Sequence, residues 1–437
     1  MNTMLHFVAF LKRQSPGRLI TLGFAAVILL GAFLLVLPVS VKPGMEVPFI
    51  DALFTSTSAV CVTGLIAIDV YDHFTLFGQI VVAALIQIGG LGVTSVGVGL
   101  ILAAGRRVSI KGRLLVKEAL NVDSFKGMVR LVKAVLLTTL CFEGAGIILS
   151  FIVFIQDYPL PRALWTSIFH SIAAFNNSGF DVLGGLQNLI PYQNNVLLNF
   201  TTCALIIFGG LGFLVILDIK RCRCFRKLSL HSKVVITTTI ALLAAGTLLL
   251  KATEDMSWLG CFFHSVSART AGFSTYPMGE LTNAGLFTLT VLMFIGASPG
   301  STGGGIKTTT FFALMQDVRS VFTKQRPGAF HRTISAESMA KAPVIALLSL
   351  LVVFVGTFLL CILEPECTFI QLLFEVVSAF GTVGLSTGIT PDLCVLSKLI
   401  VILTMFTGRV GAFTLLSIWI DRPEAGSRYT EESITIG

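Results

Sequence analysis

The chain has 437 residues, of which 54% are hydrophobic and 12% are charged, and its formal net charge is +8 at pH 7. This composition excludes a soluble globular protein and a disordered chain, and it predicts an all-α polytopic membrane protein. Because the basic residues cluster between apolar runs, the charge indicates membrane orientation and not a nucleic-acid partner.

Eight apolar runs approach or exceed the roughly 20 residues that cross a lipid bilayer. If successive runs alternate in direction, all but five of the 31 Lys and Arg fall on one side, so the positive-inside rule makes both termini cytoplasmic. Most acidic residues fall on the outer side, where they would concentrate cations. The runs cover residues 19–37, 75–103, 131–155, 195–217, 233–250, 285–315 (broken), 342–362 and 395–420, and the five exceptions are Lys42, Arg162, Lys251, Arg269 and Lys398.

Four shorter apolar stretches lie between these runs and resemble one another. Each has an aromatic residue near its start, small residues in the middle and a glycine followed by Leu or Phe. A second glycine follows 24 to 30 residues later, so we infer four repeats. The stretches read "LFTSTSAVCVTGL" (53–65), "IFHSIAAFNNSGF" (168–180), "FFHSVSARTAGF" (262–273) and "LFEVVSAFGTVGL" (373–385).

The repeats predict the domain organisation. Each consists of a transmembrane helix, a re-entrant pore helix and a second transmembrane helix, and the four are arranged with pseudo-fourfold symmetry around a central pore. We expect a cytoplasmic N-terminal tail (1–18), repeats at 19–105, 106–218, 219–315 and 316–420 with pore loops at 50–66, 163–182, 257–275 and 369–388, and a cytoplasmic C-terminal tail (421–437).

A non-helical turn at membrane depth is tolerated only where it is buried in protein or lines a water-filled path. Four such turns around one axis would direct backbone carbonyls toward it, since glycine allows the required dihedral angles. Rings of carbonyls select K⁺ by replacing its hydration shell. The predicted K⁺ filter comprises Cys61, Val62, Thr63 and Gly64; Asn176, Asn177, Ser178 and Gly179; Arg269, Thr270, Ala271 and Gly272; and Gly381, Thr382, Val383 and Gly384.

The second glycines are Gly89, Gly209, Gly296 and Gly408. In repeats 1 and 2 their "GGLG" context favours close helix packing, and in repeats 1, 2 and 4 we expect the span to continue without a long break. The third repeat instead has "GASPGSTGGGIK" (296–307). We interpret this unwound stretch as a gate below the filter, made by Gly296, Ala297, Ser298, Pro299, Gly300, Ser301, Thr302, Gly303, Gly304 and Gly305.

Arg409 places a permanent cation at the same depth in the fourth repeat, where it needs carbonyl, carboxylate or water partners. We expect it to hold the gate through carbonyls or hydroxyls of the loop and to oppose cation leak; pairing with Glu143 is the alternative. For His170 and His264, packing within the pore helices is favoured over a metal or proton-relay role. The scattered cysteines favour free thiols, and the CxC at Cys222 and Cys224 is weak support for zinc.

Together these motifs resemble the Trk/Ktr/HKT superfamily of potassium transporters over essentially the whole chain, and within it the bacterial KtrB subunits. "LVKEALN" (115–121) and "KLSLHSK" (227–233) add to that likeness. The resemblance implies a homodimer in the bacterial cytoplasmic membrane that takes up K⁺, with stimulation by Na⁺. It also implies a cytosolic KtrA-like regulatory ring that binds nucleotide. No cofactor or transition metal is expected in this chain, and Cys61 stands where the family has Thr.

Other functions remain open. A Trk-type or mixed Na⁺/K⁺ transporter would use the same architecture. A coupled secondary transporter would have inverted repeats and charged substrate ligands at mid-membrane, whereas these repeats share one orientation. An intramembrane enzyme would need a nucleophile, a base and an orienting group in one pocket, and the sequence contains no such set, so the chain is not expected to be an enzyme.

Overall fold

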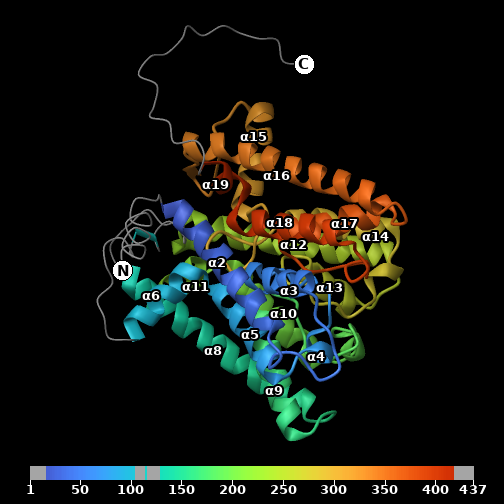
Figure 1. The fold of residues 1–437 in the computed structure, drawn as a ribbon. Helices are drawn as coiled ribbons and strands as arrows, with labels where there is room; N and C mark the ends of the chain where they lie inside the picture. Colours follow the sequence, from blue (N-terminus) through green and yellow to red (C-terminus); the bar gives the residue numbers. More distant parts are fainter. Residues whose placement is uncertain (1–15, 104–113, 116–127, 418–437) are drawn as a thin grey trace, which may run out of the picture.

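The computed structural model describes residues 16–103, 114–115 and 128–417. Nearly all of the regular structure in these residues is helical, and one short antiparallel hairpin joins β1 (Gly328–Ala329) to β2 (Arg332–Thr333). Figure 1 shows the helices packed side by side in a single bundle. The C-terminal tail, most of the N-terminal tail and the "LVKEALN" stretch after its first residue lie outside the described residues.

Four helices are each long and apolar enough to cross a membrane, and two helix pairs pass the same test only if each pair counts as one span. The described residues therefore contain four to six such spans, against eight predicted. The other two predicted spans consist of shorter helices. The single spans are α2 (Pro16–Val36), α8 (Met128–Phe154), α12 (Leu230–Thr253) and α16 (Ala336–Leu363).

The spans of repeats 1 and 2 continue past Gly89 and Gly209 without a long break, as predicted, but each bends sharply at a single residue. The chain bends by 100° between α5 (Leu76–Leu91) and α6 (Val93–Ala103), and by 94° between α10 (Val196–Leu211) and α11 (Phe213–Cys222). The residues at the breaks, Gly92 and Gly212, have φ of 81° and 90°. Glycine adopts such angles without a Cβ penalty, so a single residue ends each helix.

The last two predicted spans are divided as well. Residues 285–315 form α14 (Asn283–Phe294), an irregular loop and α15 (Thr308–Thr323), whereas residues 395–417 form α18 (Val395–Val410) and α19 (Ala412–Ser417). Gly411 separates α18 from α19 with φ of 94°, so the span of repeat 4 is also broken. Four helices of three or four residues lie in the connections between the longer ones: α4 (Val70–His73), η1 (Ile190–Tyr192), η2 (Phe225–Lys227) and η3 (Met278–Glu280).

A short apolar helix overlaps each predicted pore loop. At 10 to 16 residues, and 1.5 Å of rise per residue, none can cross a hydrocarbon core about 30 Å thick. Side-chain caps begin two of them: Ser257 accepts from the Gly260 N–H, and Thr368 forms a capping box with Gln371. These pore helices are α3 (Phe49–Cys61), α9 (Leu160–Phe175), α13 (Trp258–Ser267) and α17 (Phe369–Gly381).

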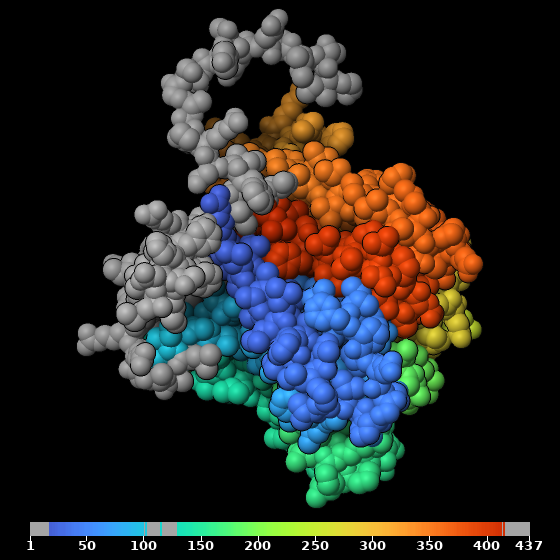
Figure 2. Space-filling model, viewed as in Figure 1, coloured from blue at the N-terminus to red at the C-terminus, as the bar shows by residue number. Residues whose placement is uncertain are grey.

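The helices pack in a cyclic order. α2 packs on α3, α8 on α9, α12 on α13 and α16 on α17, and the next pore helix then contacts the preceding span through the pairs α5–α9, α10–α13, α14–α17 and α18–α3. The last of these pairs joins the two ends of the sequence. In Figure 2 the N-terminal segment in blue and the C-terminal segment in red lie against each other.

A buried ion pair stabilises this closing contact. Lys398 Nζ, in the first turn of α18, lies 2.7 Å from Asp51 Oδ1, in the first turn of α3. Both residues are buried. Because a buried charge without its partner is costly, the pair favours the packing in which these two helices adjoin.

We expect Lys398→Met to lower the free energy of unfolding by about 3–5 kcal/mol, because it leaves the Asp51 carboxylate buried and unpaired. Combining it with Asp51→Asn should recover much of that loss. Unfolding in detergent micelles, followed by helical circular dichroism, measures both. Lys341→Met, which breaks the exposed Lys341–Glu337 pair, is the matched control and should leave unfolding unchanged. Equal effects of Lys398→Met and Lys341→Met would contradict a structural role for the buried pair.

Candidate functional site

The four stretches predicted as a filter, 61–64, 176–179, 269–272 and 381–384, have the same backbone conformation; we call them the filter segments. In each, the second residue is left-handed although it is not glycine, and the fourth is a glycine with positive φ. A left-handed residue other than glycine costs about 1 kcal/mol, so surrounding contacts must hold these turns. The φ values are 57° and 92° for Val62 and Gly64, 58° and 70° for Asn177 and Gly179, 71° and 75° for Thr270 and Gly272, and 50° and 97° for Thr382 and Gly384.

Serine hydroxyls in the pore helices supply some of those contacts. Ser58 Oγ accepts from the Gly64 N–H at 3.0 Å and donates to the Leu65 carbonyl. Ser378 Oγ accepts from the Gly384 N–H, also at 3.0 Å, and Ser267 Oγ donates to the Phe273 carbonyl. These serines are not among the predicted site residues. Their signal was available, since a serine precedes the glycine by six residues in repeats 1 and 4.

The four filter glycines close a ring. A Cβ built on any one of them would approach the carbonyl oxygen of the residue before the glycine in the next repeat, closer than 3.0 Å in every case. No side chain can be accommodated there without movement of backbone, so only glycine lets the four segments approach so closely. The distance from the built Cβ to the carbonyl oxygen is 2.2 Å for Gly64 and Ser178, 2.8 Å for Gly179 and Ala271, 2.4 Å for Gly272 and Val383, and 2.1 Å for Gly384 and Thr63.

Three of the second glycines pack against the pore helices; the sequence context favoured this for Gly89 and Gly209, and Gly408 does the same. A Cβ on Gly89, Gly209 or Gly408 would lie about 2 Å from a carbonyl oxygen at or near the end of α3, α9 or α17, respectively. Gly296 of the third repeat differs, because it faces the Gly304 carbonyl across the base of its own loop. The third repeat therefore replaces a helix contact with a loop contact.

The predicted gate, residues 296–305, lies against the filter segments; we call it the gate loop. The Gly304 N–H donates to Thr382 Oγ1 at 2.8 Å, and a Cβ on Gly303 would lie 2.1 Å from Thr270 Oγ1. A bridge between Ile295 and Ile306 brings the two ends of the loop together. The loop thus contacts the first half of filter segments three and four.

The broken span of repeat 2 pairs with the backbone of this loop. The N–H groups of Ser298 and Thr302 donate to the carbonyls of Gly210 and Gly209, at 3.1 and 3.4 Å, and the Phe213 N–H donates to the Gly300 carbonyl at 3.1 Å. The last carbonyls of a helix have no partner within it. Ending α10 at Leu211 therefore makes these carbonyls available to the loop.

Arg409 contacts the gate loop through carbonyls and not through the hydroxyls considered above. Its Nη1 donates to the Thr302 carbonyl and its Nη2 to the carbonyl of Gly89, which lies near the end of α5. Glu143, the alternative partner, instead accepts from the Asn176 side chain at 3.1 Å. Lys307, whose role was missed, donates to the Gly303 carbonyl at 2.7 Å.

Both pore-helix histidines are buried and hydrogen-bonded. His170 Nε2 lies 2.9 Å from Thr202 Oγ1, and His264 Nδ1 lies 2.9 Å from the Gly260 carbonyl oxygen. Within the described part of the chain, no three His, Cys, Asp or Glu side chains gather as metal ligands would. These contacts support packing within the pore helices.

A cavity of about 420 Å³ is lined by three of the filter glycines, Gly64, Gly272 and Gly384, and by residues that include Asp181 and Glu280. Burial of the Asp181 carboxyl, together with the nearby Asp69 and Asp72 carboxylates, raises its pKa to about 7, although the Leu183 N–H donates to it. The charge at this cavity therefore depends on pH near neutrality.

Comparison with known proteins identifies the family of this chain. The profile of the TrkH family, described as "Cation transport protein", matches residues 24–254 and 227–425. The potassium/sodium uptake protein NtpJ of Enterococcus hirae is 39% identical, with 98% of each chain covered. The Ktr system potassium uptake protein B of Bacillus subtilis is 37% identical, with 97% of each covered.

A solved structure has the same fold. The crystal structure of the potassium transporter TrkH from Vibrio parahaemolyticus superposes with a TM-score of 0.73, covering 94% of this chain and 86% of that one. The two sequences are 17% identical, so this likeness concerns the fold alone.

We expect Asp181→Asn to raise the unfolding temperature at pH 8 and to leave it unchanged near pH 4. The folded pKa, about 7, lies above the ordinary value of 3.8. Folding therefore disfavours the carboxylate, and the native carboxyl destabilises the fold progressively as pH rises from about 4 to 7. Glu280→Gln, which changes an exposed carboxyl of the same cavity, is the control. An equal effect of Asp181→Asn at both pH values would disprove the link to ionisation.

Proposed function

Because this chain belongs to the TrkH family of cation transport proteins, we propose that it is the ion-translocating subunit of a potassium uptake system. K⁺ passes through the four filter segments, which act as a backbone-carbonyl selectivity filter. Four repeats surround this pore with pseudo-fourfold symmetry. The observation that carries the proposal is the ring in which each filter glycine adjoins the carbonyl before the glycine of the next repeat.

The chemistry of the ring suits a large monovalent cation. Carbonyl oxygens can replace the hydration shell of K⁺ without presenting a full negative charge, which allows the ion to leave again. All four pore helices end at the ring, so the negative ends of their dipoles adjoin it and favour cations over anions. Glu280, and Asp181 at pH values above its raised pKa of about 7, would add negative charge at the outer mouth.

The gate loop regulates this path by lying across the inner side of the filter. Its contacts with Thr270 and Thr382 support that position, and its many glycines allow more than one conformation. Arg409 holds the loop through the Thr302 carbonyl and adds a permanent positive charge that opposes cation leak. Displacement of the loop opens the pore.

The relatives suggest the assembly. Two proteins 37% identical to this chain are named "Ktr system potassium uptake protein B", and the word system together with the letter B implies further components. We infer a homodimer in the bacterial cytoplasmic membrane, with both termini cytoplasmic and a cytosolic KtrA-like ring that binds nucleotide. Stimulation by Na⁺ belongs to the same inference, and the chain itself needs no cofactor.

Uptake of both Na⁺ and K⁺ is the second candidate. It is favoured by one observation, the name of the Enterococcus relative as a potassium/sodium uptake protein. The same filter could admit Na⁺ if the carbonyl ring is less strict, since the four segments have one glycine each. Ion competition separates the two candidates.

Uptake of radioactive rubidium into liposomes holding the purified protein tests the filter. We expect K⁺ to compete far better than Na⁺, and Gly272→Ser to reduce that preference about tenfold, equivalent to about 1.4 kcal/mol. A Cβ at Gly272 would lie 2.4 Å from the Val383 carbonyl, and φ there is 75°. Gly44→Ser is the matched control, because Gly44 has φ of 83° but no neighbour within 4 Å. Equal competition by Na⁺ and K⁺ in the unmodified protein would favour the mixed transporter.

The gate is tested by leak in the absence of the regulatory ring. Arg409→Ala removes the hydrogen bond to Thr302, so we expect rubidium efflux to rise about tenfold, the size expected for one bond from a charged donor. Shortening residues 298–303 should have a larger effect. Arg319→Ala, at an exposed site on α15, is the control. If neither loop variant leaks more than the control, the loop is not the gate.

A further inference from the structure

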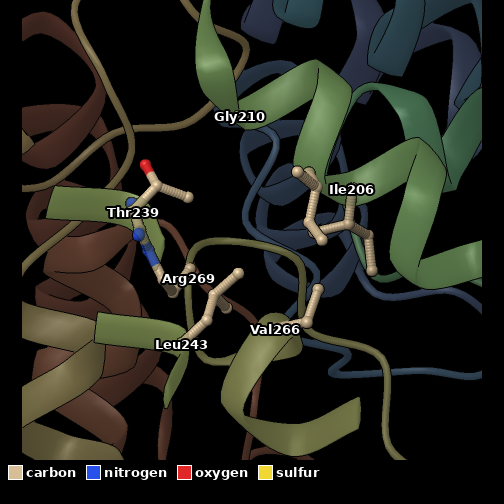
Figure 3. A pocket seen from close by; sticks show the side chains of 7 residues that line it. Ile206, Gly210, Thr239, Leu243, Val266 and Arg269 are labelled. Carbon is tan, nitrogen blue, oxygen red and sulfur yellow. The ribbon is translucent and has the colours of Figure 1, made fainter. Parts of the chain in front are cut away.

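Arg269 is the first residue of the third filter segment, and its side chain is buried among the surrounding helices. It lines a small cavity with Ile206 and Gly210 of α10, Thr239 and Leu243 of α12, and Val266 of α13, as Figure 3 shows. The space open to the centre of a water-sized group is about 10 Å³, so the cavity can hold roughly one group of that size. A permanent cation thus borders a mostly apolar cavity that it does not fill.

The guanidinium of Arg269 has a single hydrogen-bond partner in the described structure. Its Nη2 donates to the Gly296 carbonyl at 3.4 Å, whereas Nε and Nη1 have no acceptor. Neither of the two ion pairs found among the described residues includes Arg269. A buried cation is costly without acceptors, so Arg269 depends on the carbonyl at the base of the gate loop.

Gly296 is the point from which the gate loop can be controlled. It is the first residue of the loop, follows the Ile295–Ile306 bridge, and faces the Gly304 carbonyl across the base. A bond to its carbonyl therefore fixes both ends of the loop. Arg409 holds the loop elsewhere, at Thr302, so the two arginines act at different points.

An unused acceptor lies in the wall of the same cavity. Thr239 Oγ1 is buried and has no hydrogen-bond partner. Thr201, Thr202, Thr247 and Thr290 each bond the carbonyl four residues before them, whereas Thr239, like Thr139 and Thr357, does not. The Thr239 hydroxyl instead remains available to a donor that enters the cavity.

We propose that Arg269 is a positioning residue of the gate with two alternative acceptors. It bonds the Gly296 carbonyl while the loop lies against the filter, and it moves into the cavity to bond Thr239 Oγ1 when the loop is displaced. This inference rests on the proposed gating function of the loop. The Gly296 carbonyl stabilises the guanidinium only when the loop is closed, and Thr239 Oγ1 only when it is open. Removing either hydrogen bond therefore shifts the balance between closed and open loops.

The test uses the purified full chain in liposomes without a regulatory ring. Arg269→Gln removes the permanent charge at Gly296, and rubidium efflux should rise about tenfold, the size expected for a charged hydrogen bond. Arg269→Lys should leak less than Arg269→Gln, since an ammonium still donates. The preference for K⁺ over Na⁺ is measured beside the leak, because Arg269 begins a filter segment and a change of selectivity would report on the filter and not on the gate. Unfolding temperatures verify that each variant is folded.

Thr239→Val tests the second acceptor in the Arg409→Ala background, where the loop is already released. We expect it to lower efflux about threefold, the size of one neutral hydrogen bond, because the displaced loop then strands the guanidinium. Thr290→Val is the matched control: Thr290 is equally buried but bonds within its own helix. Its efflux should equal that of Arg409→Ala alone.

Three results would overturn the inference: unchanged efflux in folded Arg269→Gln, loss of K⁺ preference together with the leak, or equal effects of Thr239→Val and Thr290→Val. If Arg269→Gln does not fold, Arg269→Lys and Thr239→Val decide. The shortened loop separates this inference from the proposed gate. If the protein with the shortened loop leaks and the Arg269 variants do not, the loop is the gate but Arg269 does not position it. If the protein with the shortened loop leaks no more than the unmodified protein, the loop is not the gate.

Discussion

Backbone polar groups inside a membrane have no water to bond, and this constraint links the broken helices to the gate loop. The break after Leu211 leaves carbonyls of α10 without helical partners, whereas after Leu91 the Gly92 N–H still donates to the Gly89 carbonyl. Gly89 receives the Arg409 guanidinium, and Gly209 and Gly210 receive N–H groups of the loop. The bends and the loop are therefore one structural unit, in which each satisfies polar groups that the other leaves unpaired.

The filter segments depend on the same kind of mutual support. Four non-glycine residues there are left-handed, a conformation that local preference opposes. Serine hydroxyls behind the segments and the close approach of neighbouring glycines compensate for that cost. Because every glycine adjoins a carbonyl of the next repeat, a change in one segment is transmitted around the ring. The packing of α18 on α3 closes the same cycle at the level of helices.

The sequence predicted the parts of this architecture that depend on length and glycine. Stretches too short to cross a membrane, each ending in glycine, identified all four pore helices. The bends were not predictable from pattern, because Gly92 and Gly212 belong to "GGLG" motifs that read as helix packing. The direction of the Arg269 side chain was also inaccessible. It depends on three helices from two repeats meeting around one cavity, which is a tertiary property.

Three cations, Arg269, Lys307 and Arg409, each donate to a carbonyl of the gate loop, and none of them forms an ion pair within the described residues. A buried cation held by backbone carbonyls differs from one held by a carboxylate side chain, because the carbonyls move whenever the backbone of the loop moves. Moving the loop therefore rearranges the partners of all three cations at once. Under the proposed function, a K⁺ ion that passes the filter would approach a loop whose carbonyls are already engaged by fixed positive charge, and this charge would oppose the ion by electrostatics.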